Sequence, residues 1–129
     1  MRSIVVVDDD PDDLELICEA FTSADAKVII HAKSSGSQLF NSLSELSIGH
    51  LPSLFVVDYN MPEMSGAEVI AKLSSIEKFI GIPKVILSTS DSPYYKQVCK
   101  ENGADHYFKK PYTFPEFIDL AGEMIALIK

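Results

Sequence analysis

The chain has 129 residues, of which 47% are apolar, and a formal net charge of −8 at pH 7, so we expect one folded domain over residues 1–129. The acidic balance argues against nonspecific nucleic-acid binding and against an anionic membrane surface, because both need a basic face. No apolar run approaches the ~18 residues of a membrane span, and two cysteines without a signal peptide before Asp8 predict a cytoplasmic protein.

Five short apolar runs predict buried strands. Most are continuous and rich in β-branched or aromatic residues, which is typical of parallel strands covered on both faces. The runs are Ile4–Val7, Val28–Ile30, Leu54–Val57, Val85–Leu87 and Tyr107–Phe108.

Between these runs, apolar residues recur at helical spacing and predict five helices. The stripes are Leu14, Ile17, Cys18 and Phe21; Leu39, Phe40, Leu43 and Leu46; Val69, Ile70, Leu73 and Ile76; Tyr95, Val98 and Cys99; and Phe117, Leu120, Ala121, Met124, Ile125 and Ile128. Asp10-Pro11 predicts a helix start, and Asn102-Gly103 predicts a helix end. The connection 44–52 is somewhat long for this kind of fold.

The alternation of strands and helices predicts a doubly wound α/β fold. Right-handed crossovers between successive strands give a five-stranded parallel sheet with helices on both faces. In such sheets, functional sites lie beyond the carboxyl ends of the strands. The residues that follow each apolar run are therefore the candidates for chemistry.

Chemically distinctive residues follow four of the runs. Carboxylates (Asp8, Asp9 and Asp58), a hydroxyl (Ser88) and a lysine (Lys110) are expected at one edge of the sheet. Carboxylates gathered there repel one another unless a cation lies among them, and Mg²⁺ suits a site with few protein ligands because it keeps several waters. A cation, an ammonium and a hydroxyl together can hold a phosphoryl group. A remaining carboxylate can act as the nucleophile.

Four motifs at these positions resemble those of two-component response regulator receiver domains. Val56–Gly66, with the sequence VVDYNMPEMSG, resembles their phosphoacceptor loop, and Val7–Asp9 resembles their acidic pair. Ser88–Thr89 resembles their strand-four hydroxyl, and Lys110–Pro111 their Lys-Pro pair. The resemblance covers the whole chain and implies the flavodoxin-like (βα)5 receiver fold with strand order 2-1-3-4-5.

The resemblance implies a role for each residue near the phosphoryl group. Asp58 is expected to be the phosphoacceptor, Ser88 to hydrogen-bond the phosphoryl group, and Lys110 to pair with Asp58 or its phosphate. Tyr107 is expected to be the switch aromatic, which turns inward when Ser88 moves. The peptide bond between Lys110 and Pro111 is expected to be cis.

The resemblance also implies the ligands of the metal. Asp8, Asp9 and Asp58 are expected to hold Mg²⁺ with their carboxylates, and Asn60 with its backbone carbonyl. Ser88 stands where the family more often has threonine, so the hydroxyl is kept and a methyl group is lost.

The implied function is that of a single-domain response regulator. It would take a phosphoryl group from a sensor histidine kinase or a histidine phosphotransferase and then signal to a downstream protein or relay the phosphate. It would be a phosphoacceptor switch rather than an enzyme, with no nucleic acid or membrane partner. The fourth helix, fifth strand and fifth helix would form the docking face, for a downstream protein or for a second copy of the chain.

Plainer readings apply to several of the charged residues. Asp10 is expected to cap a helix rather than bind metal, because Pro11 follows it. Asp12, Asp13 and Glu15 are expected to form a solvated first helical turn that the helix dipole favours.

The residues themselves leave two rival functions open. One is a haloacid-dehalogenase-type phosphatase that uses the Asp8-x-Asp10 pair, and the other is a flavodoxin-like module that binds FMN.

Overall fold

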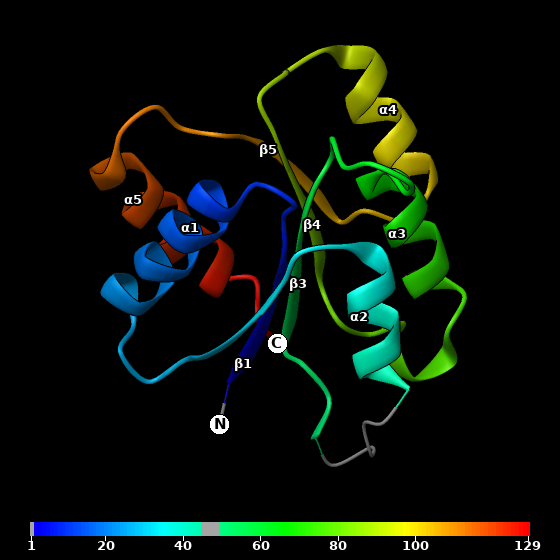
Figure 1. Cartoon of the computed structure of the whole chain (residues 1–129), viewed down its shortest axis with the longest axis horizontal. Coiled ribbons are helices and arrows are strands. Elements are labelled where there is room, and N and C mark those ends of the chain that lie inside the picture. Colours follow the sequence, from blue (N-terminus) through cyan, green and yellow to red (C-terminus); the bar gives the residue numbers. More distant parts are fainter. Residues whose placement is uncertain (1, 45–49) are drawn as a thin grey trace.

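The computed structural model describes residues 2–44 and 50–129, which form one parallel sheet flanked by helices (Figure 1). The strands are β1 (Ser3–Val7), β2 (Ile29–Lys33), β3 (Leu54–Asp58), β4 (Lys84–Ser88) and β5 (His106–Lys109). The helices are α1 (Pro11–Ala24), α2 (Gly36–Leu43), α3 (Gly66–Ser74), α4 (Pro93–Glu101) and α5 (Phe114–Ile125), with a 3₁₀ turn η2 (Glu77–Phe79). The strand order is β2-β1-β3-β4-β5, so the predicted doubly wound fold and its topology are confirmed.

The helices cover both faces of the sheet. Figure 1 shows α1 and α5 together on one side and α2, α3 and α4 on the other. Successive strand residues alternate between the two cores, because neighbouring side chains of a strand point to opposite faces. Val6 and Val56 pack with the α1 and α5 layer, whereas Val5 and Val57 pack with the other layer. This double coverage explains why the inner strands are continuous apolar runs.

The two edge strands depart from the expected double coverage. Ile29 in β2 is 41% exposed, and His106 and Lys109 in β5 are also exposed. Each edge strand has a neighbouring strand on one side only. Strand β2 extends beyond its apolar run to Lys33, because it pairs with β1 along its whole length. The expectation of buried runs holds in full for β1, β3 and β4. In β5 the predicted run is partly buried, with Tyr107 and Phe108 packed against opposite cores, and in β2 Ile29 is exposed.

The helix ends follow the sequence signals. Asp10 caps α1, since its carboxylate accepts hydrogen bonds from the backbone N–H groups of Asp12 and Asp13 at 2.9 and 3.3 Å. Gly103, with φ +106°, follows the end of α4 in the left-handed region that glycine tolerates. Leu46 and most of the connection 44–52 lie outside the described residues.

One expected backbone feature is absent. The peptide bond between Lys110 and Pro111 is trans, as is every peptide bond of the described residues, so the expected cis bond is wrong. The trans form is the one that the peptide bond favours intrinsically, even before proline. Among the described residues, no helix has the length and apolar character that crossing a membrane requires.

The start of α3 packs tightly against the end of β3. The Gly66 N–H donates a hydrogen bond to the Tyr59 carbonyl at 2.8 Å. A Cβ atom at Gly66 would lie 2.5 Å from the Asp58 carbonyl oxygen and 2.8 Å from the Tyr59 Cα. Only glycine fits this approach of backbone to backbone, which fixes the loop that follows Asp58.

Candidate functional site

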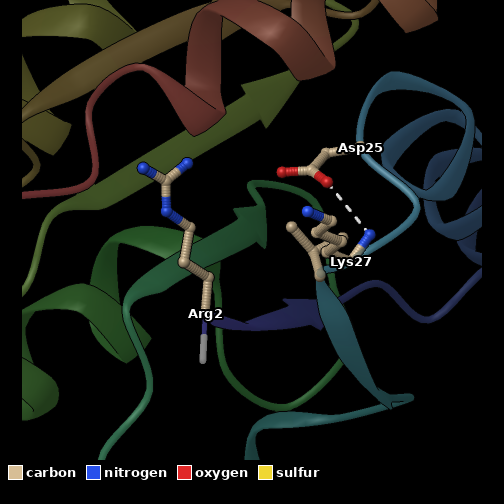
Figure 2. Close-up of a pocket in the computed structure, with 4 residues that line it drawn as sticks. Arg2, Asp25 and Lys27 are labelled. Carbon is tan, nitrogen blue, oxygen red and sulfur yellow. Dashed lines mark hydrogen bonds between the residues drawn. The ribbon is translucent and has the colours of Figure 1, made fainter.

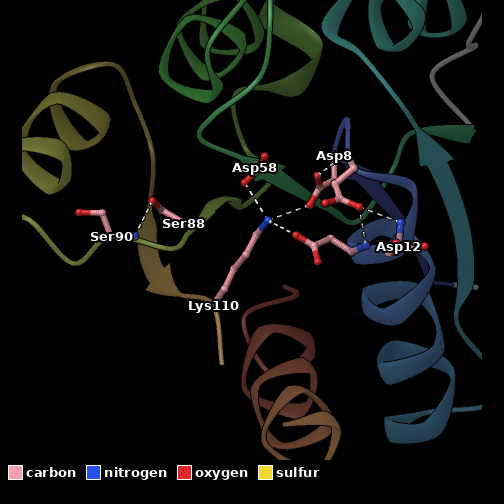
Figure 3. A network of polar contacts seen from close by, with 8 residues as sticks. Asp8, Asp12, Asp58, Ser88, Ser90 and Lys110 are labelled. Atoms are coloured by element: carbon pink, nitrogen blue, oxygen red, sulfur yellow. Dashed lines mark hydrogen bonds and ion pairs between the residues drawn. The ribbon is translucent and has the colours of Figure 1, made fainter. Parts of the chain in front are cut away.

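The carboxyl edge of the sheet gathers the residues that the sequence singled out. Asp8 follows β1, Asp58 ends β3, Ser88 ends β4 and Lys110 follows β5, and all four are buried. Figure 3 shows Asp58 between Asp8 and Ser88, as the strand order requires, with the Lys110 side chain reaching toward both carboxylates. The expected convergence of these groups at one edge is therefore found.

Lys110 lies at the centre of the charged cluster. Its Nζ atom lies 3.0 Å from Asp8 Oδ2, 3.0 Å from Asp58 Oδ1 and 3.0 Å from Asp13 Oδ2. A lysine ammonium has three N–H donors, so these three carboxylates match its full donor capacity. The backbone N–H of Lys110 also donates to the Ser88 carbonyl at 2.7 Å, which ties the lysine to the end of β4.

Asp13 is the site residue that the sequence analysis missed. It was expected to be solvated in the first turn of α1, and its side chain is 40% exposed, yet its carboxylate pairs with the buried Lys110. Side chains of a helix tilt toward its N-terminus, and α1 begins beside the end of β1. That direction was the signal that could have placed Asp13 near the cluster.

Burial changes the electrostatics of the acceptor carboxylate. Burial, with a further contribution from the charge of Asp8, raises the pKa of Asp58 from 3.8 to about 6 against the opposing effect of Lys110. Burial also raises the pKa of Asp8. It lowers the pKa of Lys110, but the neighbouring carboxylates, Asp58 foremost, raise it by more, so the ammonium stays charged. The site therefore carries more negative charge than its lysine neutralises.

Three carboxylates in the cluster fit a divalent cation. Asp8, Asp9 and Asp58 each offer an oxygen, and these three atoms lie within 4.8 Å of one another. Such hard oxygen donors suit a cation of the Mg²⁺, Mn²⁺ or Ca²⁺ type. Asn60 is exposed in the loop after β3, and its expected role as a ligand through its backbone carbonyl stays a prediction.

A chain of hydrogen bonds leads from Ser88 to β5. Ser88 Oγ accepts a hydrogen bond from the Ser90 N–H at 3.1 Å, and the Ser90 carbonyl accepts one from the Tyr107 hydroxyl at 2.5 Å. Tyr107 is half-buried, and burial raises its pKa. The loop after β4 is therefore linked to the aromatic residue that the sequence analysis expected to act as a switch.

A second hollow lies at the opposite, amino-terminal edge of the sheet. Its volume is about 750 Å³, and its lining includes Arg2, Asp25 and Lys27. Figure 2 shows Asp25 beside Lys27, whose backbone N–H donates to Asp25 at 2.9 Å. The two basic side chains are exposed. The carboxyl edge, with its buried charges, is the stronger candidate for chemistry.

The position of Asp10 bears on the rival phosphatase reading. A phosphatase of that type would need Asp10 as its acid, but this carboxylate caps α1 through the N–H groups of Asp12 and Asp13. The FMN reading would need a phosphate-binding loop after β1, where the structure instead places the acids Asp8 and Asp9. Neither rival gains support from the geometry.

Comparison with known sequences gives a consistent result. A family model described as the response regulator receiver domain matches residues 4–121. Two-component response regulator ORR11 of Oryza sativa subsp. japonica is 33% identical over 109 residues, which cover 84% of this chain and 70% of that protein. Histidine kinase P4 of Formosa agariphila is 41% identical over 73 residues, which cover 57% of this chain but only 5% of that protein. The chain thus corresponds to a small part of that kinase.

Comparison with solved structures agrees on the fold. The crystal structure of the Mn²⁺-bound form of response regulator Rcp1 superposes with a TM-score of 0.82 and covers 98% of this chain and 94% of that one. The two sequences are 20% identical, so this similarity shows a shared fold.

Proposed function

The chain belongs to the response regulator receiver domain family, and on this premise we propose that it accepts a phosphoryl group on Asp58 in a Mg²⁺-dependent reaction. The donor would be a sensor histidine kinase or a histidine phosphotransferase, and residues 1–129 would act as one receiver unit. The observation that carries the proposal is the buried Asp58 carboxylate, which pairs with Lys110 beside two further acids. The family acts as a phosphoacceptor switch, and self-dephosphorylation of Asp58 is part of the proposal.

The position of Asp58 supports its role as the nucleophile. One of its oxygens lies 3.0 Å from Lys110 Nζ, and no hydrogen bond to its other oxygen is found among residues 2–44 and 50–129. An oxygen of Asp58 would bond to phosphorus as the bond from phosphorus to the donor's histidine nitrogen breaks. Formation of the acyl phosphate removes the charge of Asp58, one of the three carboxylates around Lys110, so the N–H that faced Asp58 can donate to a phosphoryl oxygen instead.

The acidic cluster supports the choice of metal. Asp8, Asp9 and Asp58 would hold Mg²⁺, with the Asn60 backbone carbonyl as a further ligand, and water would complete the coordination. When bound, the cation supplies positive charge beside the phosphoryl oxygens. The same charge offsets the repulsion among the acids, which Lys110 alone does not balance.

The hydrogen bonds around Ser90 support a switch. We propose that the Ser88 hydroxyl bonds the phosphoryl group and that its movement shifts Ser90, whose carbonyl binds the Tyr107 hydroxyl. The state of the site would then reach the face formed by α4, β5 and α5. Tyr94 at the start of α4 is 70% exposed, and an exposed aromatic side chain suits the docking of a downstream protein or a second copy.

Replacing Asp58 tests the acceptor assignment. With Mg²⁺ and acetyl phosphate, the wild-type protein is expected to gain one phosphoryl group by intact-mass measurement, and Asp58→Asn is expected to gain none. Asp12→Asn is the matched control, because it removes the same charge from an exposed position and should keep full labelling. Labelling of Asp58→Asn at another residue would refute the assignment.

Replacing Asp9 tests the metal site. Asp9→Asn removes a charged oxygen from the cluster, and its Mg²⁺ affinity is expected to fall by roughly tenfold or more. Titration of the protein with Mg²⁺ by calorimetry or NMR measures this. Asp12→Asn serves again as the control for net charge, and an affinity of Asp9→Asn equal to that of the control would contradict the ligand role.

A further inference from the structure

We propose that Asp13 is a positioning residue that holds Lys110 in place for phosphoryl transfer to Asp58, an inference that rests on the proposed function. Asp13 lies in the first turn of α1, 97 residues from Lys110 in the chain, and its Oδ2 atom lies 3.0 Å from Lys110 Nζ. The resemblance of the four sequence motifs implies no role for this residue.

The geometry gives Asp13 a task that its neighbours cannot share. Lys110 has three carboxylate partners, Asp8, Asp58 and Asp13, each at 3.0 Å. Asp8 and Asp58 also belong to the cluster that can hold a cation, whereas Asp13 lies outside that cluster as found among the described residues. Asp13 can therefore keep its contact with Lys110 while the other two acids bind metal or phosphorus.

The three contacts fix the direction of the ammonium. A lysine side chain has four rotatable carbon bonds and needs several partners to stay in one place. Asp13 would keep its N–H donor throughout, and the donor that pairs with Asp58 Oδ1 would pass to an oxygen of the arriving phosphoryl group. The O–P bond forms on Asp58 as the bond from phosphorus to the leaving group breaks, and Lys110 keeps its protons throughout.

Stabilising the fold is not the main role of the ion pair between Asp13 and Lys110. The Asp13 side chain is 40% exposed, and ion pairs with a solvated partner add little to the stability of a fold. Charge alone predicts the opposite effect on the rate, because removal of a negative charge near the site favours an anionic phosphoryl donor. If Asp13 positions Lys110, its removal slows phosphorylation, whereas the loss of its charge alone would speed phosphorylation. The direction of the rate change therefore distinguishes the two effects.

The experiment compares Asp13→Asn and Asp13→Ala with Asp12→Asn, which removes the same charge one residue away. The rate of Asp58 phosphorylation is measured at increasing acetyl phosphate, with saturating Mg²⁺. For Asp13→Ala we expect the maximal rate to fall about tenfold, with the half-saturating concentration and the Mg²⁺ affinity changed less than about twofold. Asp13→Asn keeps an oxygen that can accept a hydrogen bond, so its rate should fall less, and Asp12→Asn should behave as wild type.

A second measurement does not depend on phosphorylation. NMR relaxation of the Lys110 side chain should show greater motion at Cε and Nζ in Asp13→Ala than in wild type or Asp12→Asn. An unchanged Lys110 side chain, or a maximal rate of Asp13→Ala that equals or exceeds that of wild type, would overturn the positioning role. A wild-type protein that takes no label on Asp58 would instead overturn the proposed function, and this role with it.

Discussion

In metal-free buffer at pH 7, Asp58→Asn is expected to raise the free energy of unfolding by up to about 3 kcal/mol. Burial and the charge of Asp8 raise the pKa of Asp58 from 3.8 to about 6 in the folded protein. The folded state therefore binds more protons than the unfolded state between these values. Stability falls as the pH rises from about 4 to about 6, and the loss persists at pH 7. An asparagine carries no charge and so avoids this loss.

Urea unfolding of both proteins at two pH values, with a chelator present, measures the effect. The advantage of Asp58→Asn should be largest at pH 7 and should nearly vanish at pH 4, where the folded wild type already holds a proton on Asp58. Asp12→Asn changes the net charge equally and serves as the control for that change. An equal gain at both pH values would show that ionisation of Asp58 is not the cause.

The expected gain in the free energy of unfolding of Asp58→Asn indicates how much the charged site destabilises the folded protein. The acids at the carboxyl edge are held together against their mutual repulsion, and Lys110 offsets only part of it. Such an arrangement lowers stability and favours binding of positive charge, which suits the proposed function of the site.

The inner strands of the fold could be predicted from the sequence because the signal for them lies in short continuous stretches of apolar residues. Val56 and Ile86 belong to runs that are apolar on both faces, and such runs leave little choice but a central parallel strand. Once the sheet is parallel, the residues after each run must share one edge, which is why Asp8, Asp58 and Lys110 could be brought together in advance. The edge strand β2 was harder, because its pairing with β1 from Ile29 to Lys33 depends on backbone hydrogen bonds rather than on apolar side chains.

Two charged residues show where sequence reasoning stopped. Asp13 has an adequate local explanation as an acid near a helix N-terminus, and its contact with Lys110 arises only when the Lys110 side chain, just after β5, reaches the first turn of α1. Lys84 is 3% exposed, and its Nζ donates to the carbonyls of Phe79 and Ile82 at 2.7 and 2.8 Å. Nothing in the local sequence distinguishes it from a surface lysine, because its partners are backbone atoms of the turn before β4.

Gly66→Ala is expected to lower the free energy of unfolding by about 3 kcal/mol, at the upper end for overpacking. The added Cβ would lie 2.5 Å from the Asp58 carbonyl oxygen and 2.8 Å from the Tyr59 Cα. Both atoms belong to the backbone, so no side chain can rotate away to make room. The end of β3 must shift, and the Asp58 carboxylate shifts with it.

Gly122→Ala in α5 is the matched control. A Cβ there would meet nothing within 4 Å, so the same substitution should stabilise the protein by up to about 1 kcal/mol through helix propensity. Urea unfolding of the two variants should therefore give changes of opposite sign. Phosphorylation of Asp58 should slow in Gly66→Ala and stay normal in Gly122→Ala. If Gly66→Ala unfolds and phosphorylates as the wild type does, the loop after β3 adjusts without cost, and the tight contact does not hold Asp58 in place.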